Sequence, residues 1–290
     1  MHVGLAEGRR IPDDDAARID VAVFTGDVWT SGLERPFFGV VLGAPNVRWL
    51  HTFSAGTDAP AFQWLRDRGV TVTSSAGASS RPIAHSVMMY VLSLCRTARH
   101  WSIDQSAHVW RQHSHPDVEG RTMGIVGLGH IGSEVARLAP HFGMRVIGVR
   151  RTPRGDEPCE TWPTERLHEL LPLLDDLVIT APLTPETEKM IGERELALLR
   201  PGAHVVNVGR GPIVDEGALV AALQDGRVGA AALDVFEVEP LPADSPLWDM
   251  PNVIVSPHNS GQTPLAVQRT VEIFTAHLAH FAAGEPLLDT

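Results

Sequence analysis

Short apolar runs rich in β-branched residues alternate with helix-compatible stretches from residue 123 onward. Six runs read as strands: MGIVG (123–127), RVIGV (145–149), DLVIT (176–180), AHVVNV (203–208), VGAAALDV (228–235) and NVIVS (252–256). Segments such as 133–142 and 216–224 fit helices between them, whereas 150–165 is polar, proline-rich and typical of an exposed connection. Strands that alternate with helices predict an α/β fold with a doubly wound parallel sheet.

The first 75 residues carry shorter apolar segments, at 21–25, 40–42, 47–50 and 70–73, with glycine and proline between them. These segments predict strands joined by helices or turns. The segment 82–95 (PIAHSVMMYVLSLC) repeats apolar residues at helical spacing and opens on Pro82, so it predicts a buried helix. It is too short to span a bilayer.

A glycine pattern follows the first strand of the second half. Gly127, Gly129 and Gly132 fit G-x-G-x-x-G, placed after a predicted strand and opening a predicted helix. In dinucleotide-binding folds the first glycine permits a tight turn, the second admits the pyrophosphate, and the third allows close helix packing. The helix N-terminus supplies N–H groups for the phosphates. We therefore predict a dinucleotide site here.

Two arginines follow the next strand, where NAD enzymes tend to place an acidic residue that binds the ribose. Arg150 stands 18 residues after Gly132, and Arg151 follows it. Two guanidinium groups could pair with a 2′-phosphate, so the sequence favours NADP(H). NAD(H) stays possible, because a backbone carbonyl or a nearby aspartate could bind its ribose.

Candidate catalytic residues follow three successive predicted strands. The strand order 3-2-1-4-5-6 places the last three strands under the nicotinamide half of the cofactor, with ligands at their carboxyl ends. Arg210 follows the run at 203–208, Asp234 and Glu239 follow or end the run at 228–235, and His258 follows the last run. An arginine, a carboxylate and a histidine are thus expected at one edge of the sheet.

This set suits the reduction of a 2-oxo acid. Arg210 can hold a substrate carboxylate through two parallel hydrogen bonds. Hydride addition to the carbonyl leaves an oxyanion that needs a proton, and His258 is the expected donor. Glu239 would orient that histidine and favour its protonated form.

Composition narrows the class of protein. The chain has 290 residues, enough for about two domains, and a net charge of −11. The acidic balance argues against nucleic acid and anionic membranes as partners. Two cysteines, Cys95 and Cys159, cannot form a disulfide framework, and no secretory signal is evident, so we expect a cytoplasmic enzyme. His113 and His115 could chelate a metal, but no cysteine pair accompanies them and we predict none.

The motifs together resemble the D-isomer-specific 2-hydroxyacid dehydrogenases over about residues 45–265. They are GLGHIG (127–132), PLTPET (182–187), NVGRGPIVDEGAL (207–219), ALDVFEVEPLP (232–242) and NVIVSPHNSG (252–261). The resemblance implies that Arg210, Glu239 and His258 are catalytic and that Asp234 contacts the nicotinamide carboxamide.

The resemblance also implies further binding residues. The loop SAGTD (54–58) matches the family's substrate loop, in which the N–H groups of Ala55 and Gly56 would hold the substrate carboxylate. The remaining cofactor contacts would come from four residues: His130, Ile131, Pro182 and Val208.

The family fold predicts two domains with the active site in the cleft between them. Residues 1–79 and 263–290 would form a smaller, flavodoxin-like substrate domain, and 80–262 a Rossmann dinucleotide-binding domain. Family members usually have a further strand and helix before the segment at 21–25, so we expect a shortened substrate domain. The helix from Pro82 would contribute to a homodimer interface.

The leading hypothesis is a reductase of small 2-oxo acids, close to glyoxylate and hydroxypyruvate reductases and preferring NADPH. A second class stays open: a dinucleotide-sensing protein like the corepressors that share this fold, or a degenerate member that binds cofactor without turnover. Turnover discriminates between them.

Overall fold

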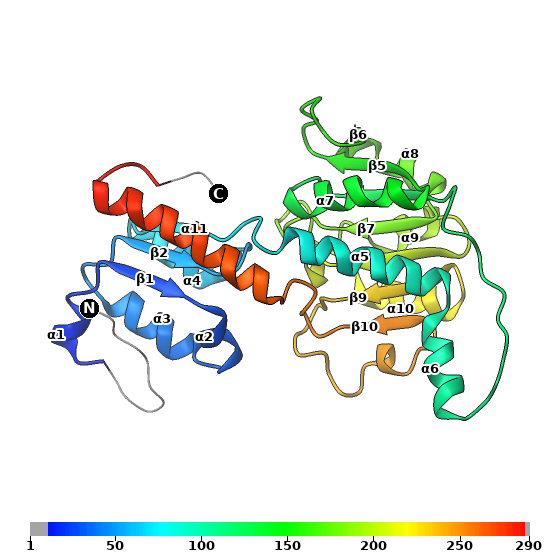
Figure 1. Cartoon of the computed structure of the whole chain (residues 1–290), viewed down its shortest axis with the longest axis horizontal. Coiled ribbons are helices and arrows are strands. Elements are labelled where there is room, and N and C mark those ends of the chain that lie inside the picture. Colours follow the sequence, from blue (N-terminus) through cyan, green and yellow to red (C-terminus); the bar gives the residue numbers. More distant parts are fainter. Residues whose placement is uncertain (1–10, 288–290) are drawn as a thin grey trace. The chain divides into compact units, whose positions relative to one another are not determined.

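The computed structural model describes residues 11–287, which form two compact units (Figure 1). The larger unit is the continuous segment Ser80–Gln262. The smaller unit combines the residues up to Ser79 with those from Thr263 onward. Each unit is built around its own parallel sheet, which confirms the predicted α/β class.

The larger unit contains a seven-stranded parallel sheet in the order β10-β9-β8-β7-β4-β5-β6. The chain therefore starts in the interior of the sheet at β4, adds strands on one side, and then crosses over to the other. The strands are β4 (Thr122–Val126), β5 (Arg145–Arg150), β6 (Glu160–Pro163), β7 (Asp176–Ile179), β8 (Ala203–Asn207), β9 (Val228–Leu233) and β10 (Val253–Val255).

The segment 150–165 is not only a connection, as the sequence suggested. Its residues Glu160–Pro163 form β6, which pairs with β5 at the edge of the sheet. We had predicted β7 as the third strand of this sheet in chain order, but β6 precedes it and makes it the fourth. It pairs with β4 on the side away from β5. An edge strand needs few apolar residues and tolerates proline. The short, polar sequence of β6 therefore shows no strand pattern.

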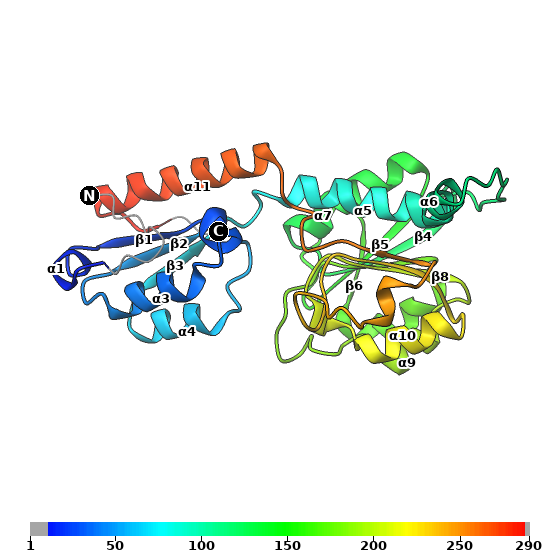
Figure 2. The ribbon, with the colours of Figure 1, turned by 90° about the horizontal axis from the view of Figure 1, so that it is seen from below.

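Helices cover both faces of this sheet (Figure 2). Helices α5 and α7 pack together on one face, and α9 and α10 on the other. Because strand side chains alternate between faces, neighbours such as Val205 and Val206 enter different cores. The helices are α5 (Ser80–Cys95), α6 (Ala98–Ser106), α7 (His130–Leu138), α8 (Leu167–Leu170), α9 (Glu193–Leu198) and α10 (Glu216–Gln224).

The smaller unit has a three-stranded parallel sheet in the order β1-β2-β3. Helices α3 and α4 cover one face and α11 the other (Figure 2). Its elements are α1 (Asp13–Ala16), β1 (Val21–Phe24), α2 (Gly26–Thr30), α3 (Glu34–Gly43), β2 (Trp49–Thr52), α4 (Pro60–Asp67), β3 (Thr71–Ser74) and α11 (Pro264–Ala283).

The apolar run at 40–42 lies within α3 rather than in a strand, so that prediction was wrong. Phe37 and Val41, one helical turn apart, are both buried against β1 and β2. A three-residue apolar run has no period long enough to separate a strand from the buried face of a helix.

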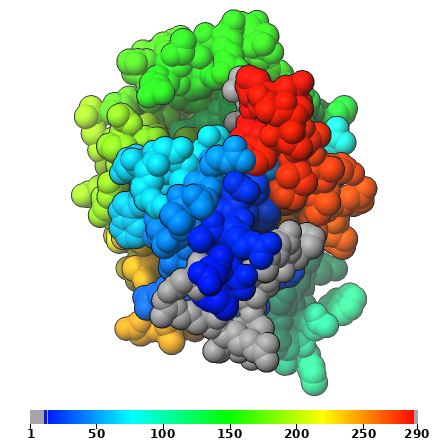
Figure 3. Space-filling view, turned by 90° about the vertical axis from the view of Figure 1, so that its left-hand side faces the viewer, coloured from blue at the N-terminus to red at the C-terminus, as the bar shows by residue number. Residues whose placement is uncertain are grey.

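Alternate residues of β2 pack against α11. Trp49 stacks on Phe274 with ring centroids 5.5 Å apart, and His51 lies 5.5 Å from the His277 ring. This packing attaches the C-terminal helix to the sheet built from the start of the chain. Figure 3 shows α11, orange to red, along the surface of this unit.

The expectation of a shortened N-terminal region falls on residues 1–10, which lie outside the described residues. Within residues 11–287, no helix is both long enough and apolar enough to cross a membrane.

Candidate active site

The predicted site residues of the larger unit all lie at or just beyond the carboxyl ends of its strands. Gly127 follows β4, Arg150 ends β5, and Pro182 lies three residues past β7. Val208 and Arg210 follow β8, Asp234 and Glu239 follow β9, and His258 follows β10. Because the strands are parallel, these ends meet at one edge of the sheet, where α/β proteins bind ligands.

The three glycines of the motif meet three different geometric demands. Gly127 has φ +102°, and a Cβ there would lie 2.6 Å from Ala181. A Cβ on Gly132 would lie 2.1 Å from the carbonyl oxygen of Gly127, so glycine lets α7 pack against the turn. A Cβ on Gly129 would meet nothing within 4 Å. That open position is the one at which a pyrophosphate must approach the backbone, so the turn fits a dinucleotide.

The N-terminus of α7 faces this turn. Gly129 is its N-cap residue and forms no side-chain cap, and His130 and Ile131 are the first helical residues. Thr180 fixes the turn by donating from Oγ1 to the carbonyl oxygen of Gly127 at 2.5 Å. The helix therefore presents unpaired N–H groups and the positive end of its dipole beside the open glycine.

Arg150 and Arg151 lie at the end of β5, beside the glycine turn. The N–H of Gly127 donates to the carbonyl oxygen of Val149 at 2.9 Å, which joins the two strand ends. Arg150 is partly buried and pairs with Glu157 at 3.2 Å, whereas Arg151 is exposed. Both positions fit a group that would bind the adenosine ribose or its 2′-phosphate.

Asn207 shapes the loop that carries Arg210. Its side chain accepts from the N–H of Gly209 at 3.0 Å and donates to the carbonyl oxygen of Arg210 at 3.0 Å. Gly211 lets this loop lie against the next one, since a Cβ there would be 1.9 Å from the carbonyl group of Phe236. The arginine is thereby fixed close to the segment that leads to Glu239.

His258 and Glu239 form a hydrogen-bonded pair. His258 Nδ1 lies 2.8 Å from Glu239 Oε2, and the two side chains are 47% and 32% exposed. An ionised carboxylate can only accept, so Nδ1–H is the donor and Nε2 stays available. His258 has φ +50°, a strained conformation for a non-glycine residue. Its N–H donates to the carbonyl oxygens of Asp234 and Ser256 at 2.9 and 3.0 Å.

The charge state of Glu239 follows from its neighbours. Partial burial acts to raise its pKa, but the hydrogen bond and charge of His258, the N–H of Phe236 and the charge of Arg210 outweigh it. The pKa of Glu239 is therefore below its ordinary value, and the carboxylate is ionised at neutral pH. Arg210 itself lies on the loop that packs against the segment leading to Glu239.

Asp234 supports the loop that bears His258. Its buried carboxylate accepts from Ser256 Oγ at 2.5 Å, from the N–H of Asn259 at 3.1 Å, and from the N–H and hydroxyl of Ser260. These contacts use the acceptor capacity of both oxygens. In this structure Asp234 therefore orders the histidine loop, and its contact with a nicotinamide stays a prediction.

The loop from Ser54 to Asp58 follows β2 in the smaller unit. Ser54 Oγ donates to the carbonyl oxygen of Gly56 at 2.8 Å, and Arg66 donates to Thr57 Oγ1 at 2.7 Å. These bonds fix the turn and leave the N–H groups of Ala55 and Gly56 without a hydrogen-bond partner inside residues 11–287. Both groups could bind an anion.

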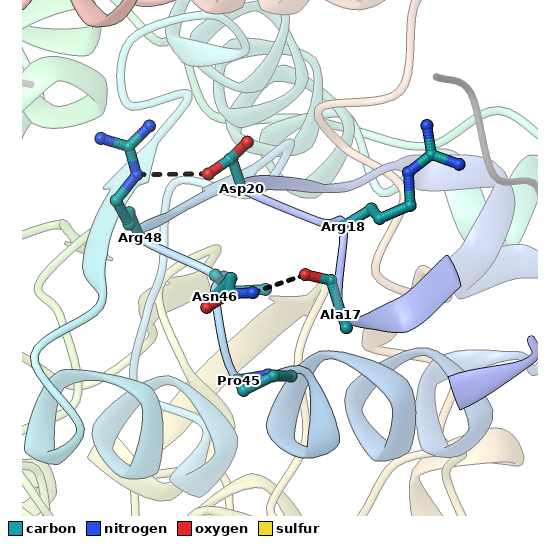
Figure 4. Close-up of a pocket in the computed structure, with 7 residues that line it drawn as sticks. Ala17, Arg18, Asp20, Pro45, Asn46 and Arg48 are labelled. Carbon is teal, nitrogen blue, oxygen red and sulfur yellow. Dashed lines mark hydrogen bonds and ion pairs between the residues drawn. The ribbon is translucent and has the colours of Figure 1, made fainter. Parts of the chain in front are cut away.

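A surface pocket of the smaller unit lies at the opposite ends of its strands (Figure 4). Asp20 precedes β1 and Arg48 precedes β2, and the two form an ion pair at 3.4 Å. Asn46 donates to the carbonyl oxygen of Ala17 at 2.6 Å. These groups already bind one another at the amino ends of the strands, so we assign the pocket no chemistry.

One group of potential metal ligands, Cys95, Asp176 and His204, is buried among the described residues. Arg121 donates to both oxygens of Asp176 at 2.8 and 3.1 Å, which balances its charge. Burial raises the pKa of the Cys95 thiol to about 11, so it keeps its proton. We interpret the group as a structural polar cluster. The other candidate, His113, is bonded through Nε2 to Asp104 at 2.8 Å.

Sequence reasoning missed the residues that hold the catalytic candidates in place. Asn207, Ser256 and Ser260 carry no chemistry that marks them in the sequence, and their partners become visible only in the folded loops. Tyr90 of α5 was not singled out either, and burial raises its pKa. The motif spacing could have indicated Asn207, since it begins the N-x-x-R-G pattern.

Comparisons with known proteins agree with this geometry. The glyoxylate/hydroxypyruvate reductase B of Yersinia pestis is 39% identical over 228 residues, which are 76% of this chain and 70% of the relative. A D-isomer specific 2-hydroxyacid dehydrogenase from Xanthobacter autotrophicus, solved with NADPH and MES, has a TM-score of 0.79 and 32% identity, and the match covers 94% of this chain and 84% of that one.

A second solved structure is the NADPH-dependent glyoxylate/hydroxypyruvate reductase of Sinorhizobium meliloti in complex with NADP and sulfate. It has a TM-score of 0.77 and 30% identity, and the match covers 93% of this chain and 84% of that one. Residues 88–260, more than half of the chain, match the family described as D-isomer specific 2-hydroxyacid dehydrogenase, NAD binding domain. This chain belongs to the D-isomer-specific 2-hydroxyacid dehydrogenase family.

Proposed function

We propose that the chain reduces small 2-oxo acids of the glyoxylate and hydroxypyruvate type to D-2-hydroxy acids, with NADP(H) as the favoured cofactor. The observation that carries this proposal is the pair formed by His258 and Glu239 at 2.8 Å, with Arg210 on the adjoining loop. We infer three roles at one edge of the sheet: His258 as proton donor, Glu239 as the residue that orients it, and Arg210 as the group that binds the substrate carboxylate. The glycine turn that fits a dinucleotide lies at the same edge.

His258 is the proposed proton donor. A nicotinamide cofactor bound at this edge would supply the hydride. Because Nδ1–H is bonded to the ionised Glu239, the proton for the substrate oxygen comes from Nε2 of the imidazolium. Glu239 stabilises that imidazolium and fixes the ring, so it acts as a positioning residue.

Arg210 is the proposed anchor for the substrate carboxylate. A guanidinium group presents parallel N–H donors that match a carboxylate and keep their charge at every physiological pH. The N–H groups of Ala55 and Gly56, in the smaller unit, are proposed as donors to a substrate carboxylate. Small 2-oxo acids offer one carboxylate next to the reacting carbonyl, and a guanidinium group can bind that carboxylate through two parallel hydrogen bonds.

The proposed cofactor contacts divide into two groups. The pyrophosphate would contact the turn at Gly127, Gly129 and Gly132 and the helix start at His130 and Ile131. Arg150 and Arg151 would bind the 2′-phosphate, which is why NADP(H) is favoured over NAD(H). The nicotinamide half would be contacted by residues that follow β7, β8 and β9: Pro182, Val208 and Asp234.

We further propose that the chain forms a homodimer through its larger unit. The segment from α6 into the following loop exposes large apolar side chains, with Trp110 96% exposed and Trp101 and Ile103 both 46% exposed. Met89 of α5, the helix expected at the interface, is 54% exposed. Burial of such side chains favours association, and light scattering of the purified chain would give the mass of the assembly.

The test is a matrix of initial rates: glyoxylate, hydroxypyruvate and pyruvate, each with NADPH and with NADH. We expect turnover of at least one acid, a higher kcat/KM with NADPH, and D-glycerate as the product from hydroxypyruvate. Cofactor binding without turnover of any acid would contradict the proposal and favour a dinucleotide-sensing protein.

A further inference from the structure

The loop after β5 already contains an anion. The Glu157 carboxylate accepts from Arg150 at 3.2 Å and from the backbone N–H groups of Arg154 and Gly155 at 2.6 and 2.8 Å. Its side chain is only 5% exposed. Three donors from a segment of six residues thus converge on one carboxylate.

These three donors are the kind that bind a phosphate. A guanidinium group and consecutive backbone N–H groups form anion sites throughout α/β proteins. One of them, Arg150, is the residue that a 2′-phosphate needs at the end of this strand. The carboxylate of Glu157 therefore engages a group that NADP(H) also requires.

We propose that Glu157 is a selectivity residue that opposes the 2′-phosphate of NADP(H) and so keeps NAD(H) usable. The inference rests on the proposed function, because it assigns a further residue to the same cofactor site. A bound 2′-phosphate must compete with Glu157 for the Arg150 guanidinium and experiences its negative charge. The 2′-hydroxyl of NAD(H) is neutral and experiences neither effect.

The charge state of Glu157 supports the same role as its contacts. The N–H of Arg154 is the largest influence on its pKa, which lies below the ordinary value, and Arg150 adds to the lowering. Glu157 is therefore ionised wherever the enzyme would work, and its charge opposes a phosphate across that range.

The test is Glu157→Gln, which removes the charge and keeps one oxygen, enough to accept from one of the two N–H groups, which bind different oxygens of the carboxylate. Dissociation constants for NADPH and NADH are measured by calorimetry, together with those of adenosine 2′,5′-bisphosphate and AMP as probes of the phosphate alone. The matched control is Glu160→Gln. Glu160 pairs with Arg145, at the other end of β5, at 2.9 Å.

We expect the ratio of the NADPH to the NADH dissociation constant to fall about tenfold in Glu157→Gln, the scale of one charge-assisted hydrogen bond. Adenosine 2′,5′-bisphosphate should bind more tightly while AMP is unchanged, and Glu160→Gln should match the wild type. In an Arg150→Gln background, the gain from Glu157→Gln should largely disappear, since the competition is for Arg150.

An unchanged ratio, or weaker binding of NADPH, overturns the inference. Loss of both dinucleotides in the variant also overturns it, because the carboxylate would then serve the fold of the loop. If the wild type binds neither dinucleotide, the proposed function itself is wrong. If it binds them and the ratio does not respond, only the role of Glu157 is wrong.

Discussion

Replacing Glu239 by glutamine tests how the catalytic pair works. The change keeps the size of the side chain and a hydrogen-bond acceptor for His258 Nδ1–H, but removes the negative charge 2.8 Å from the ring. The imidazolium that must donate a proton during reduction is then less stable. The rate of reduction should therefore fall.

The size of the effect follows from the geometry. Two unit charges about 4 Å apart attract by about 1 kcal/mol in water and about 4 kcal/mol at the effective dielectric constant of a protein surface. Because the side chains of His258 and Glu239 are 47% and 32% exposed, solvent screens the pair and the lower part of that range applies. Loss of an interaction of roughly 1.4 kcal/mol corresponds to a rate about tenfold lower.

The assay is kcat/KM for hydroxypyruvate reduction with NADPH, measured for wild type and variant under the same conditions. We expect kcat/KM to fall about tenfold in Glu239→Gln. Glu237→Gln is the control, since Glu237 lies two residues away and faces Lys189 at 3.8 Å instead. A kcat/KM that stays at the wild-type value, or rises, would refute the role of the pair.

Three further predictions concern Arg210 as the anchor of the substrate carboxylate, the glycine turn after β4, and the buried ion pair between Arg121 and Asp176. Arg210→Gln should lower kcat/KM for every 2-oxo acid at least a hundredfold, on the order of two charge-assisted hydrogen bonds, with the NADPH dissociation constant unchanged by calorimetry. Gly132→Ala, which brings a Cβ within 2.1 Å of a backbone oxygen, should lower both the melting temperature and NADPH affinity. Gly129→Ala meets open space and should weaken NADPH binding alone. Arg121→Gln leaves the buried Asp176 carboxylate short of donors and should cost about 3–5 kcal/mol in urea unfolding at pH 7. Although burial acts to raise the pKa of Asp176, bonds from His204 and Arg121 lower it, so this difference should shrink as pH falls.

The sequence predicted the strongly periodic elements and missed the weakly patterned ones. The segment 216–224 was predicted as a helix and is α10 (Glu216–Gln224). The edge strand β6 (Glu160–Pro163) was missed because it buries little and ends on proline. At 40–42 the apolar run was assigned to a strand, because only the packing of α3 shows which face it buries.

The candidate site could be predicted in part. Arg210, Glu239 and His258 were found because parallel strands bring residues after successive strands to one edge. Asp234 was found as well, but its role in the structure, holding Ser260 and its neighbours, depends on loop contacts between residues more than 20 positions apart. No periodicity encodes such contacts. The contacts of Glu157 are local, since the nearest and farthest partners lie 2 and 7 residues away, but the polar segment that contains them has no periodic pattern.

The most direct test of the proposed mechanism compares wild type and His258→Ala in hydroxypyruvate reduction at saturating NADPH. The account predicts that kcat falls at least a hundredfold, the usual scale of general acid catalysis, while the NADPH dissociation constant stays within about twofold. A near-normal kcat in His258→Ala would contradict the account, because the proton would then come from another group.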